Sequence, residues 1–183
     1  RSFTIDSTLI TKAIAQFERT LISGNTKFDK YLSGGATLSL EELNGFNIFM
    51  DETKGDCFHC HGSDNNPLWT DNSFHNNGLD ALFTDIGLGA VTGDPNDYGK
   101  FRSPSLRNLA FTSPYMHDGR FATLEEVINH YSEGLQNSST IDPLMKKINQ
   151  GGVLLTLQEK EDLKAFLLTL TDSEFINNPD FQN

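Results

Sequence analysis

Two cysteines and two histidines form one compact motif, Cys57-Phe58-His59-Cys60-His61. Cysteines separated by two residues, with histidine directly after the second, are the attachment signature of c-type haem. Each thiol adds to one vinyl group of the porphyrin, so the sulfurs must be spaced as the vinyl groups are, and a chain turning into a helix provides that spacing. His61 then lies beneath the ring, where an imidazole nitrogen can bind iron. The motif predicts one covalent haem c on Cys57 and Cys60, with His61 as the proximal ligand.

Two other chemistries use a Cys-x-x-Cys pair, zinc binding and thiol–disulfide exchange. A zinc site needs a second pair of cysteine or histidine ligands, and Cys57 and Cys60 are the only cysteines in the sequence. A thioredoxin-like dithiol belongs to a βαβ context, which the chain does not present. His59, inside the motif, is expected to face solvent and not the iron.

The distal ligand of the iron has two main candidates. Met116 lies in a segment bounded by Pro114 and Gly119, and a thioether suits a low-spin, high-potential haem, so Met116 leads on chemistry alone. Tyr131 competes, although its place on an amphipathic helix also fits an ordinary core tyrosine. Met50 and Met145 are expected to be packing residues. The imidazoles of His75, His117 and His130 can also ligate iron, but each is expected to be a hydrogen-bonding or surface residue.

Helical spacing of apolar residues predicts a first helix over residues 6–23, with Asp6 or Ser7 as N-cap and Gly24 at its end. Its apolar positions are Leu9, Ile10, Ala13, Ile14, Phe17 and Leu21. A short helical piece with Phe28, Tyr31 and Leu32 follows, and Gly34-Gly35 stops it.

Three capping boxes, at Ser39, Thr123 and Thr156, predict the starts of three further helices. The helix that begins at Ser39 is expected to run directly into the haem motif and to bury Leu40, Leu43, Phe46, Phe49 and Met50. The second ends near Ser132, before Gly134, with an apolar face of Leu124, Val127, Ile128 and Tyr131. The third carries the stripe Leu163, Phe166, Leu167 and Leu170, as in a final helix folded over a cytochrome core.

Residues 62–121 are rich in Gly, Pro, Asn and Asp and lack periodicity. Such a long irregular segment is unusual within a compact domain, but it can pack against a large prosthetic group. Its expected anchors are Trp69, Phe74, Leu82, Phe83, Ile86 and Phe101. The polar tail after Thr171 is expected to be loosely held. The fold class is therefore mainly α: a cytochrome c-like helical domain around one covalent haem c, with a long irregular loop region.

The chain has 183 residues, a formal net charge of −11 and a pI near 4.7. Its length suits one domain with a buried core, and its acidity makes nucleic acid and anionic membranes poor partners. No apolar run approaches the length of a membrane span. The first residue is Arg1 and not methionine, so the chain is expected to have been processed or trimmed. Covalent haem attachment takes place outside the cytoplasm, so we expect an exported, periplasmic bacterial protein.

Several motifs together resemble bacterial di-haem cytochrome c peroxidases and MauG-like proteins. They cover nearly the whole chain and match the C-terminal haem domain with its lead-in helix: Ala15–Gly24, Phe28–Leu32, Cys57–His61, Leu68–Asp71, Phe74–Gly78, Lys100–Asn108, Thr112–Gly119 and Ala122–Glu126. The resemblance implies that residues 1–35 are the lead-in helix from the inter-domain segment and that residues 36–183 are the C-terminal cytochrome c domain.

The resemblance also implies a distal ligand. Peroxidases of this family carry a distal methionine on the helix after the Ala-Thr-Leu-Glu motif, and MauG-like members carry tyrosine there. Tyr131 occupies that place, so the resemblance implies a His61/Tyr131 haem, with Met116 as the alternative. An anionic phenolate favours ferric iron and lowers the reduction potential relative to methionine.

Other family residues have counterparts in this chain. Arg107 and His117 resemble residues around the haem and its propionates, where an arginine can be a bidentate partner; for Arg107 a surface ion pair is the alternative. The family binds calcium between its haems through carbonyls that correspond to Thr112 and Pro114. An asparagine ligand from the other domain is missing from this chain, so calcium binding is expected to be weak or absent.

In this family, peroxide reacts at a haem in the N-terminal domain, and the second haem passes or stores oxidising equivalents. The resemblance implies that the chain is this electron-relay domain of a MauG-like oxidoreductase. Its partners would be an N-terminal peroxidatic haem domain or chain, a redox protein and hydrogen peroxide. Alone, a six-coordinate relay haem is expected to react poorly with peroxide. The alternatives are a free-standing mono-haem electron-transfer cytochrome with His61/Met116 ligation, and a haem sensor or structural module.

Overall fold

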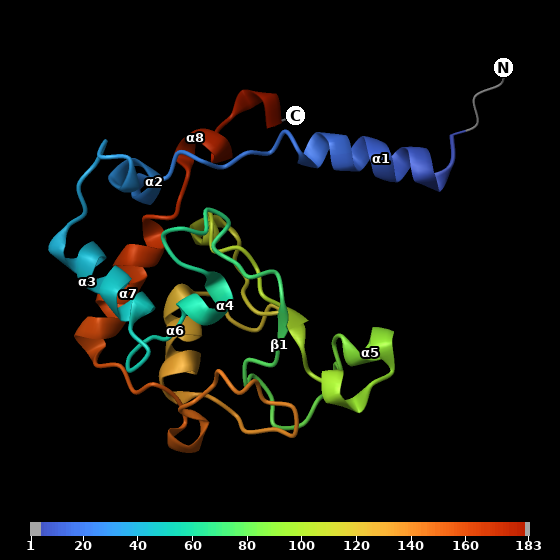
Figure 1. Ribbon diagram of the computed structural model, residues 1–183, viewed down its shortest axis with the longest axis vertical. Helices are drawn as coiled ribbons and strands as arrows, with labels where there is room; N and C mark the ends of the chain where they lie inside the picture. Colours follow the sequence, from blue (N-terminus) through green and yellow to red (C-terminus); the bar gives the residue numbers. More distant parts are fainter. Residues whose placement is uncertain (1–4, 182–183) are drawn as a thin grey trace.

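Helices from the two ends of the chain pack together in the computed structural model, which describes residues 5–181 (Figure 1). The longer helices are α1 (Ser7–Glu18), α3 (Leu40–Met50), α6 (Leu124–Glu133) and α7 (Leu157–Leu168). The shorter ones are α2 (Lys27–Leu32), α4 (Phe58–His61), α5 (Gly89–Thr92) and α8 (Ser173–Ile176). Single 3-10 turns occur at η1 (Pro95–Asp97), η2 (Leu109–Phe111), η3 (Ile148–Gln150) and η4 (Pro179–Phe181).

Between α4 and α6 the chain contains little regular structure. Its strands β1 (Phe74–His75) and β2 (Phe101–Arg102) are antiparallel, with Phe74 opposite Arg102 and His75 opposite Phe101. The regular secondary structure of the described residues is thus mainly helical, as the patterning predicts. None of their helices combines the length and the apolar character that crossing a membrane requires.

The three predicted capping boxes are confirmed. Ser39, Thr123 and Thr156 each accept a hydrogen bond from the backbone N–H three residues on, and the glutamate there accepts one from the cap's own N–H. These reciprocal bonds satisfy donors that a helix start leaves unpaired. Helix α6 ends before Gly134 as expected, and the predicted stripe of α7 is buried. A fourth box, Thr26 with Asp29, begins α2 and was not predicted.

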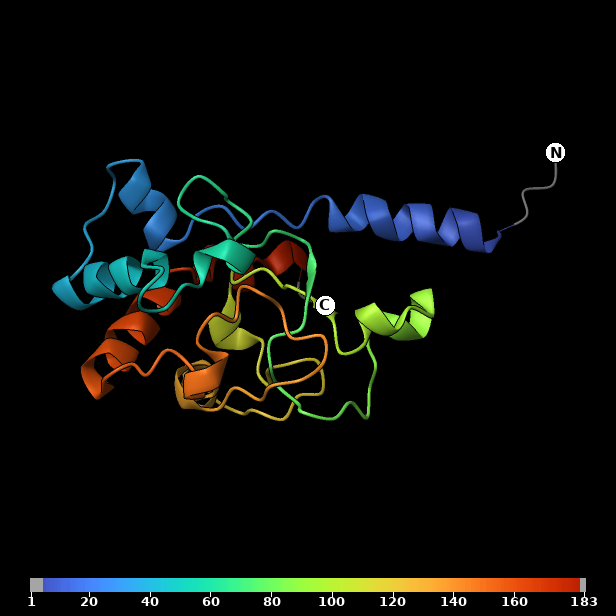
Figure 2. The same cartoon turned by 60° about the horizontal axis from the view of Figure 1, so that its bottom comes forward.

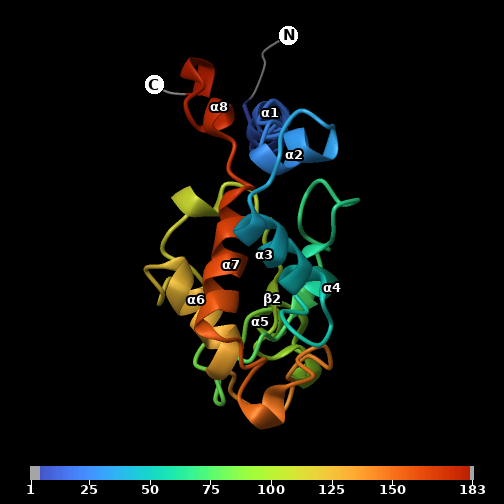
Figure 3. The same cartoon turned by 90° about the vertical axis from the view of Figure 1, so that its left-hand side faces the viewer.

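Helix α3 packs along α7, and α6 lies on another side of α7 (Figure 3). The predicted inner face of α3 is wrong at its start: Leu40 is 69% exposed and Leu43 is exposed, whereas Gly45, Ile48 and Phe49 are buried. The reason is the close approach at Gly45, where an added Cβ would lie 1.9 Å from the Asp162 carbonyl oxygen of α7. This contact orients the helix. Residues 51–56 also turn between α3 and the haem motif, so the predicted direct continuation is wrong.

An aromatic core joins segments that are distant in the sequence. The rings of Phe28, Phe49, Trp69 and Phe166 are almost fully buried, with centroids 5.2–5.6 Å apart in edge-on pairs. Edge-to-face contacts at this spacing are favourable beyond their buried area. Of the expected loop anchors, Trp69 packs in this core. Phe74 is 43% and Leu82 is 87% exposed, and packing of the loop anchors on haem stays a prediction.

Helix α1 extends away from the rest of the chain (Figure 2) and buries none of its residues. Asp6 caps it as predicted, but it ends at Glu18, earlier than residue 23. Beyond the turn at Thr20, the Ser23 hydroxyl and the Asn25 N–H donate hydrogen bonds to the Asp172 carboxylate. These contacts hold residues 23–25 against the body of the protein, where the helix cannot continue.

The tail after Thr171 is more ordered than expected. Asp172 is 2% exposed and caps α8 by accepting a hydrogen bond from the Phe175 N–H. Its own N–H donates to the Asn108 side chain. Because a buried carboxylate needs several donors, this segment is attached to both Ser23–Asn25 and Asn108, and the prediction of a loose tail is wrong there.

Candidate haem site

The cysteines of the motif lie on one helical turn. Cys57 precedes α4 and its N–H donates to the Phe49 carbonyl at the end of α3, while the His61 N–H donates to the Cys57 carbonyl. The backbone thereby presents both thiols and the His61 imidazole from a single turn. Cys57 and Cys60 are not joined in a disulfide.

Both thiols lie in an environment that suppresses thiolate formation. Burial, together with nearby acidic groups, raises the pKa of Cys57 and of Cys60 to about 12. Redox-active dithiols have lowered pKa values, because the thiolate is their reactive form. The geometry therefore does not favour a thioredoxin-like role for this pair, in agreement with the sequence-based argument.

The His61 ring is oriented by its surroundings. Its Nδ1 lies 3.2 Å from the Pro104 carbonyl oxygen and 3.3 Å from the Ser103 Oγ, and the Ser103 hydroxyl donates to the Cys60 carbonyl. Burial lowers the pKa of His61 to about 4, so the imidazole is neutral at pH 7. A neutral ring whose Nδ1–H donates to a carbonyl leaves Nε2 as the ligand atom. This donor set fits the proximal side of a haem c.

Both distal candidates contact one asparagine side chain. The Asn77 Nδ2 lies 3.1 Å from the Tyr131 hydroxyl oxygen and 3.5 Å from the Met116 Sδ. Burial raises the pKa of Tyr131 to about 12, opposed by the Asn77 hydrogen bond and supported by the charges that Cys60 and Cys57 can carry. The structure therefore brings Tyr131 and Met116 to the same asparagine, although the three residues are distant in the sequence.

His75 lies in a charged network that sequence reasoning missed. Its Nδ1 is 2.6 Å from the Asp142 Oδ2 and its Nε2 is 2.8 Å from the Asp71 Oδ2. The Asp71 N–H donates to the Cys60 carbonyl, so the network adjoins the haem motif. Asp71 and His75 are four residues apart in the sequence, which was the available indication that they could pair. The pairing of Asp142 with His75 could not be predicted without the fold.

The remaining histidines have other contacts. His117 is exposed and stacks on Phe101, with ring centroids 3.6 Å apart. His130 is buried, and its Nε2 lies 3.3 Å from the Asn77 carbonyl oxygen. His59 is half-buried, with its Nδ1 2.6 Å from the Asp56 Oδ1, so it is less open to solvent than expected. A role for His117 beside the haem stays a prediction.

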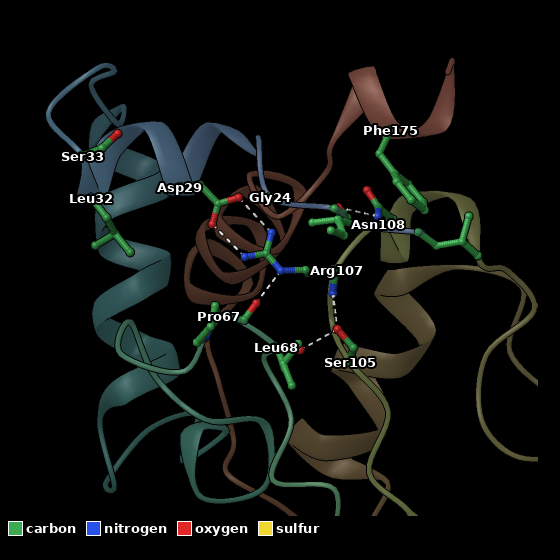
Figure 4. Close-up of a pocket in the computed structure, with 13 residues that line it drawn as sticks. Gly24, Asp29, Leu32, Ser33, Pro67, Leu68, Ser105, Arg107, Asn108 and Phe175 are labelled. Carbon is green, nitrogen blue, oxygen red and sulfur yellow. Dashed lines mark hydrogen bonds and ion pairs between the residues drawn. The ribbon is translucent and has the colours of Figure 1, made fainter. Parts of the chain in front are cut away.

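Arg107 forms the ion pair that was its alternative assignment. Its guanidinium donates two hydrogen bonds to Asp29, at 2.8 and 2.7 Å, and its Nε contacts the Pro67 carbonyl (Figure 4). These residues line a pocket of about 790 Å³, which Leu21–Gly24 and Phe175 also border. Burial raises the pKa of Asp29, but the Arg107 and Thr26 hydrogen bonds outweigh it and lower that pKa. A role for Arg107 at a propionate stays a prediction.

The calcium expectation also stays a prediction. Thr112 and Pro114 are exposed, and the Thr112 hydroxyl donates to the Leu109 carbonyl. Within residues 5–181, no three His, Cys, Asp or Glu side chains are grouped so that they could hold a metal ion.

Comparison with known proteins gives consistent results. A family profile described as di-haem cytochrome c peroxidase matches residues 3–37. The cytochrome-c peroxidase IdrP1 of Pseudomonas sp. (strain SCT) is 34% identical, over 89% of this chain and 49% of the relative. The methylamine utilization protein MauG of Methylophilus methylotrophus is 38% identical, over 88% and 46%.

Solved structures show the same relationship. A MauG-like protein associated with microbial copper homeostasis superposes with a TM-score of 0.83 and 40% identity, over 99% of this chain and 58% of that one. The diheme peroxidase BthA from Burkholderia thailandensis E264 shares the fold, with a TM-score of 0.70 and 24% identity, over 83% and 47%. The chain spans about half the length of the curated relatives it matches. It belongs to the family of di-haem cytochrome c peroxidases and MauG-like proteins.

Proposed function

We propose that this chain is the C-terminal, electron-relay haem c domain of a MauG-like di-haem peroxidase. The observation that carries the proposal is the half-buried Tyr131, whose hydroxyl accepts a hydrogen bond from Asn77 and whose pKa is raised in part by the charges that Cys60 and Cys57 can carry. A relay haem needs protein ligands on both sides, because an open position is what peroxide requires. In this proposal His61 and Tyr131 would be the two residues that hold the iron.

Each residue has a defined part in this proposal. Cys57 and Cys60 hold the haem covalently, and His61 binds the iron through Nε2, since Nδ1 is engaged by Pro104 and Ser103. When bound, the haem supplies one-electron chemistry. Tyr131 would ligate as the phenolate, an anionic ligand that favours ferric iron and lowers the reduction potential. The domain would then store or pass oxidising equivalents without binding peroxide itself.

The peroxide-reacting haem would lie in an N-terminal half, on the same protein or on a separate chain. The chain covers only about half of its relatives, and α1 has exposed apolar residues on a helix that buries nothing in this chain, namely Ile10, Ile14 and Phe17. Such a surface is suited to packing against another domain. We place the protein in the bacterial periplasm, because c-type haem is attached outside the cytoplasm.

Electronic and spin-resonance spectra of the haem-loaded ferric protein test the ligand assignment. Tyr131→Phe should remove the tyrosine-ligated spectrum, and Tyr131→Phe combined with Met116→Leu should open the distal side and shift the spectrum from low towards high spin, because no ligand atom then remains. Met116→Ala, the matched variant in the same site, should leave the low-spin spectrum unchanged. An unchanged spectrum in Tyr131→Phe together with an altered one in Met116→Ala would show that the assignment is wrong.

A second candidate function follows from the Met116 sulfur lying 3.5 Å from Asn77. With Met116 as ligand, the chain would be a mono-haem electron-transfer cytochrome of higher potential. Methionine-ligated ferric haem has a weak sulfur-to-iron charge-transfer band at the red end of the visible spectrum, and tyrosine-ligated haem lacks it. The wild-type spectrum therefore separates the two functions.

A further inference from the structure

The side chain of Asn77 lies between the two residues that compete for the distal position. Its Nδ2 is 3.1 Å from the Tyr131 hydroxyl oxygen and 3.5 Å from the Met116 Sδ. We propose that Asn77 is a positioning residue that selects Tyr131 over Met116 as the distal ligand. This inference rests on the proposed function and identifies the group that decides its ligand.

The chemistry of the amide gives the selection a direction. The Nδ2 group only donates hydrogen bonds, so the tyrosine oxygen must accept. A hydrogen bond donated to an ionised oxygen is stronger than one to a neutral acceptor and favours the charged form. The methionine sulfur is a weak acceptor in either case. The same donor therefore stabilises tyrosine as a phenolate ligand much more than it stabilises a methionine ligand.

Asn77 is held firmly enough to act in this way. The backbone carbonyl oxygen of Asn77 lies 3.3 Å from the His130 Nε2, and His130 directly precedes Tyr131 on α6. On its other side, Asn76 is buried and donates to the hydroxyls of Ser138 and Thr140. Gly78 has a φ of 70° and its carbonyl accepts from the Gln136 N–H. The segment is thus attached to α6 and to the chain that follows it.

The backbone turn around Met116 also holds this residue in place, so the alternative ligand stays close to Asn77 and Tyr131. The φ of Met116 is 71°, in the left-handed region that non-glycine residues adopt at a cost. The neighbouring Tyr115 pairs with Phe121, and this pairing closes the turn that contains Met116. The structure therefore keeps a second ligand side chain near the first, and a small difference in hydrogen bonding decides between them.

The test uses the haem-loaded ferric protein and two variants of Asn77. Asn77→Leu keeps a similar size and removes the donor, and Asn77→Asp keeps the shape and places an acceptor beside the tyrosine oxygen. Both should shift the ratio of tyrosine to methionine ligation towards methionine by about tenfold or more, the size expected from losing a hydrogen bond to a charged group. The readout is the growth of the charge-transfer band at the red end of the spectrum.

Two controls make the result specific. Asn47→Asp introduces the same change on the exposed side of α3 and should leave the spectrum as in the wild type. Adding Met116→Leu to Asn77→Leu should abolish the new band, because no sulfur remains to bind. Variants of Asn77 that keep a pure tyrosine spectrum would overturn the inference while the proposed ligand stands. A methionine band in the wild type itself would overturn both.

Discussion

At the scale of single residues, His75 shows how a side chain outside the Cys57–His61 motif can support the candidate site. Both its ring nitrogens lie against carboxylates, those of Asp142 and Asp71. Burial lowers the pKa of His75, but the hydrogen bonds to Asp142 and Asp71 outweigh it, so the net pKa is raised above 6.5. The fold therefore favours the imidazolium form of His75, which can donate to both Asp71 and Asp142 beside Cys60.

A raised folded-state pKa sets the sign of the pH dependence. The contribution of His75 to stability is complete below its unfolded pKa of about 6.5 and is lost as the pH rises through the higher folded value. Denaturant unfolding of the haem-loaded protein should therefore show stability falling over this range. Burial lowers the pKa of His130, so His130 titrates below this range.

At pH 6, His75→Gln should lower the unfolding free energy by about 1–3 kcal/mol, because the substitution removes the charged hydrogen bonds to Asp71 and Asp142. The cost should shrink as the pH is raised, because the wild type loses the same charge. A variant whose deficit is constant across that range would contradict the imidazolium assignment. Asn47→Gln, at an exposed position of α3 outside this network, is the control and should be nearly silent.

At the scale of elements, one close helix contact sets the packing of α3. Gly45 lies so near α7 that an added Cβ would be 1.9 Å from the Asp162 carbonyl oxygen and 2.8 Å from the Phe166 Cβ. The obstacle is mainly backbone, so a side-chain rotation cannot relieve it. The two helices must separate if residue 45 gains a side chain, and the buried rings of Phe49 and Phe166 would lose contact.

Gly45→Ala should therefore destabilise the protein by about 1–3 kcal/mol or more, the usual cost of overpacking, even though alanine favours helix. Chemical denaturation of the haem-loaded protein measures this difference. Gly24→Ala is the control, because nothing lies within 4 Å of its added Cβ, and it should change the unfolding free energy by less than about 0.5 kcal/mol. Equal effects of the two substitutions would show that helix separation is not the cause.

At the scale of the whole molecule, the chain divides into a body and a projecting helix. Helix α1 has no buried residues, whereas the segment that follows it is attached through Asp172 to Ser23 and Asn25. Phe28 of α2 then enters the aromatic core. Part of the predicted 1–35 segment therefore packs with the body, and only its first portion is free to contact another domain.

Removal of residues 1–18 should leave the unfolding free energy unchanged within about 0.5 kcal/mol, because α1 has no buried residues. Asp172→Ala should cost about 1–3 kcal/mol, because it leaves buried donors of the neighbouring segment unpaired. Thermal unfolding of the two haem-loaded variants beside the full chain makes the comparison. A large loss of stability on truncation would mean that α1 packs on the body in solution.

The sequence by itself determined the local features. The Cys57–His61 motif predicts its chemistry because two thiols and an imidazole on one turn match the edge of a porphyrin. The capping boxes at Ser39, Thr123 and Thr156 were predictable because their bonds span three residues. The resemblance of the spaced motifs also indicated the family.

Only the tertiary structure decided how distant residues meet. It brought Asn77 between Tyr131 and Met116, placed Asp142 on His75 and paired Arg107 with Asp29. Hydrogen bonds over such sequence separations depend on how helices and loops pack, and no local pattern encodes that packing. The inner face of α3 likewise followed from the contact of Gly45 with α7, since periodicity shows that a helix has an apolar side but a neighbouring helix determines which residues it covers.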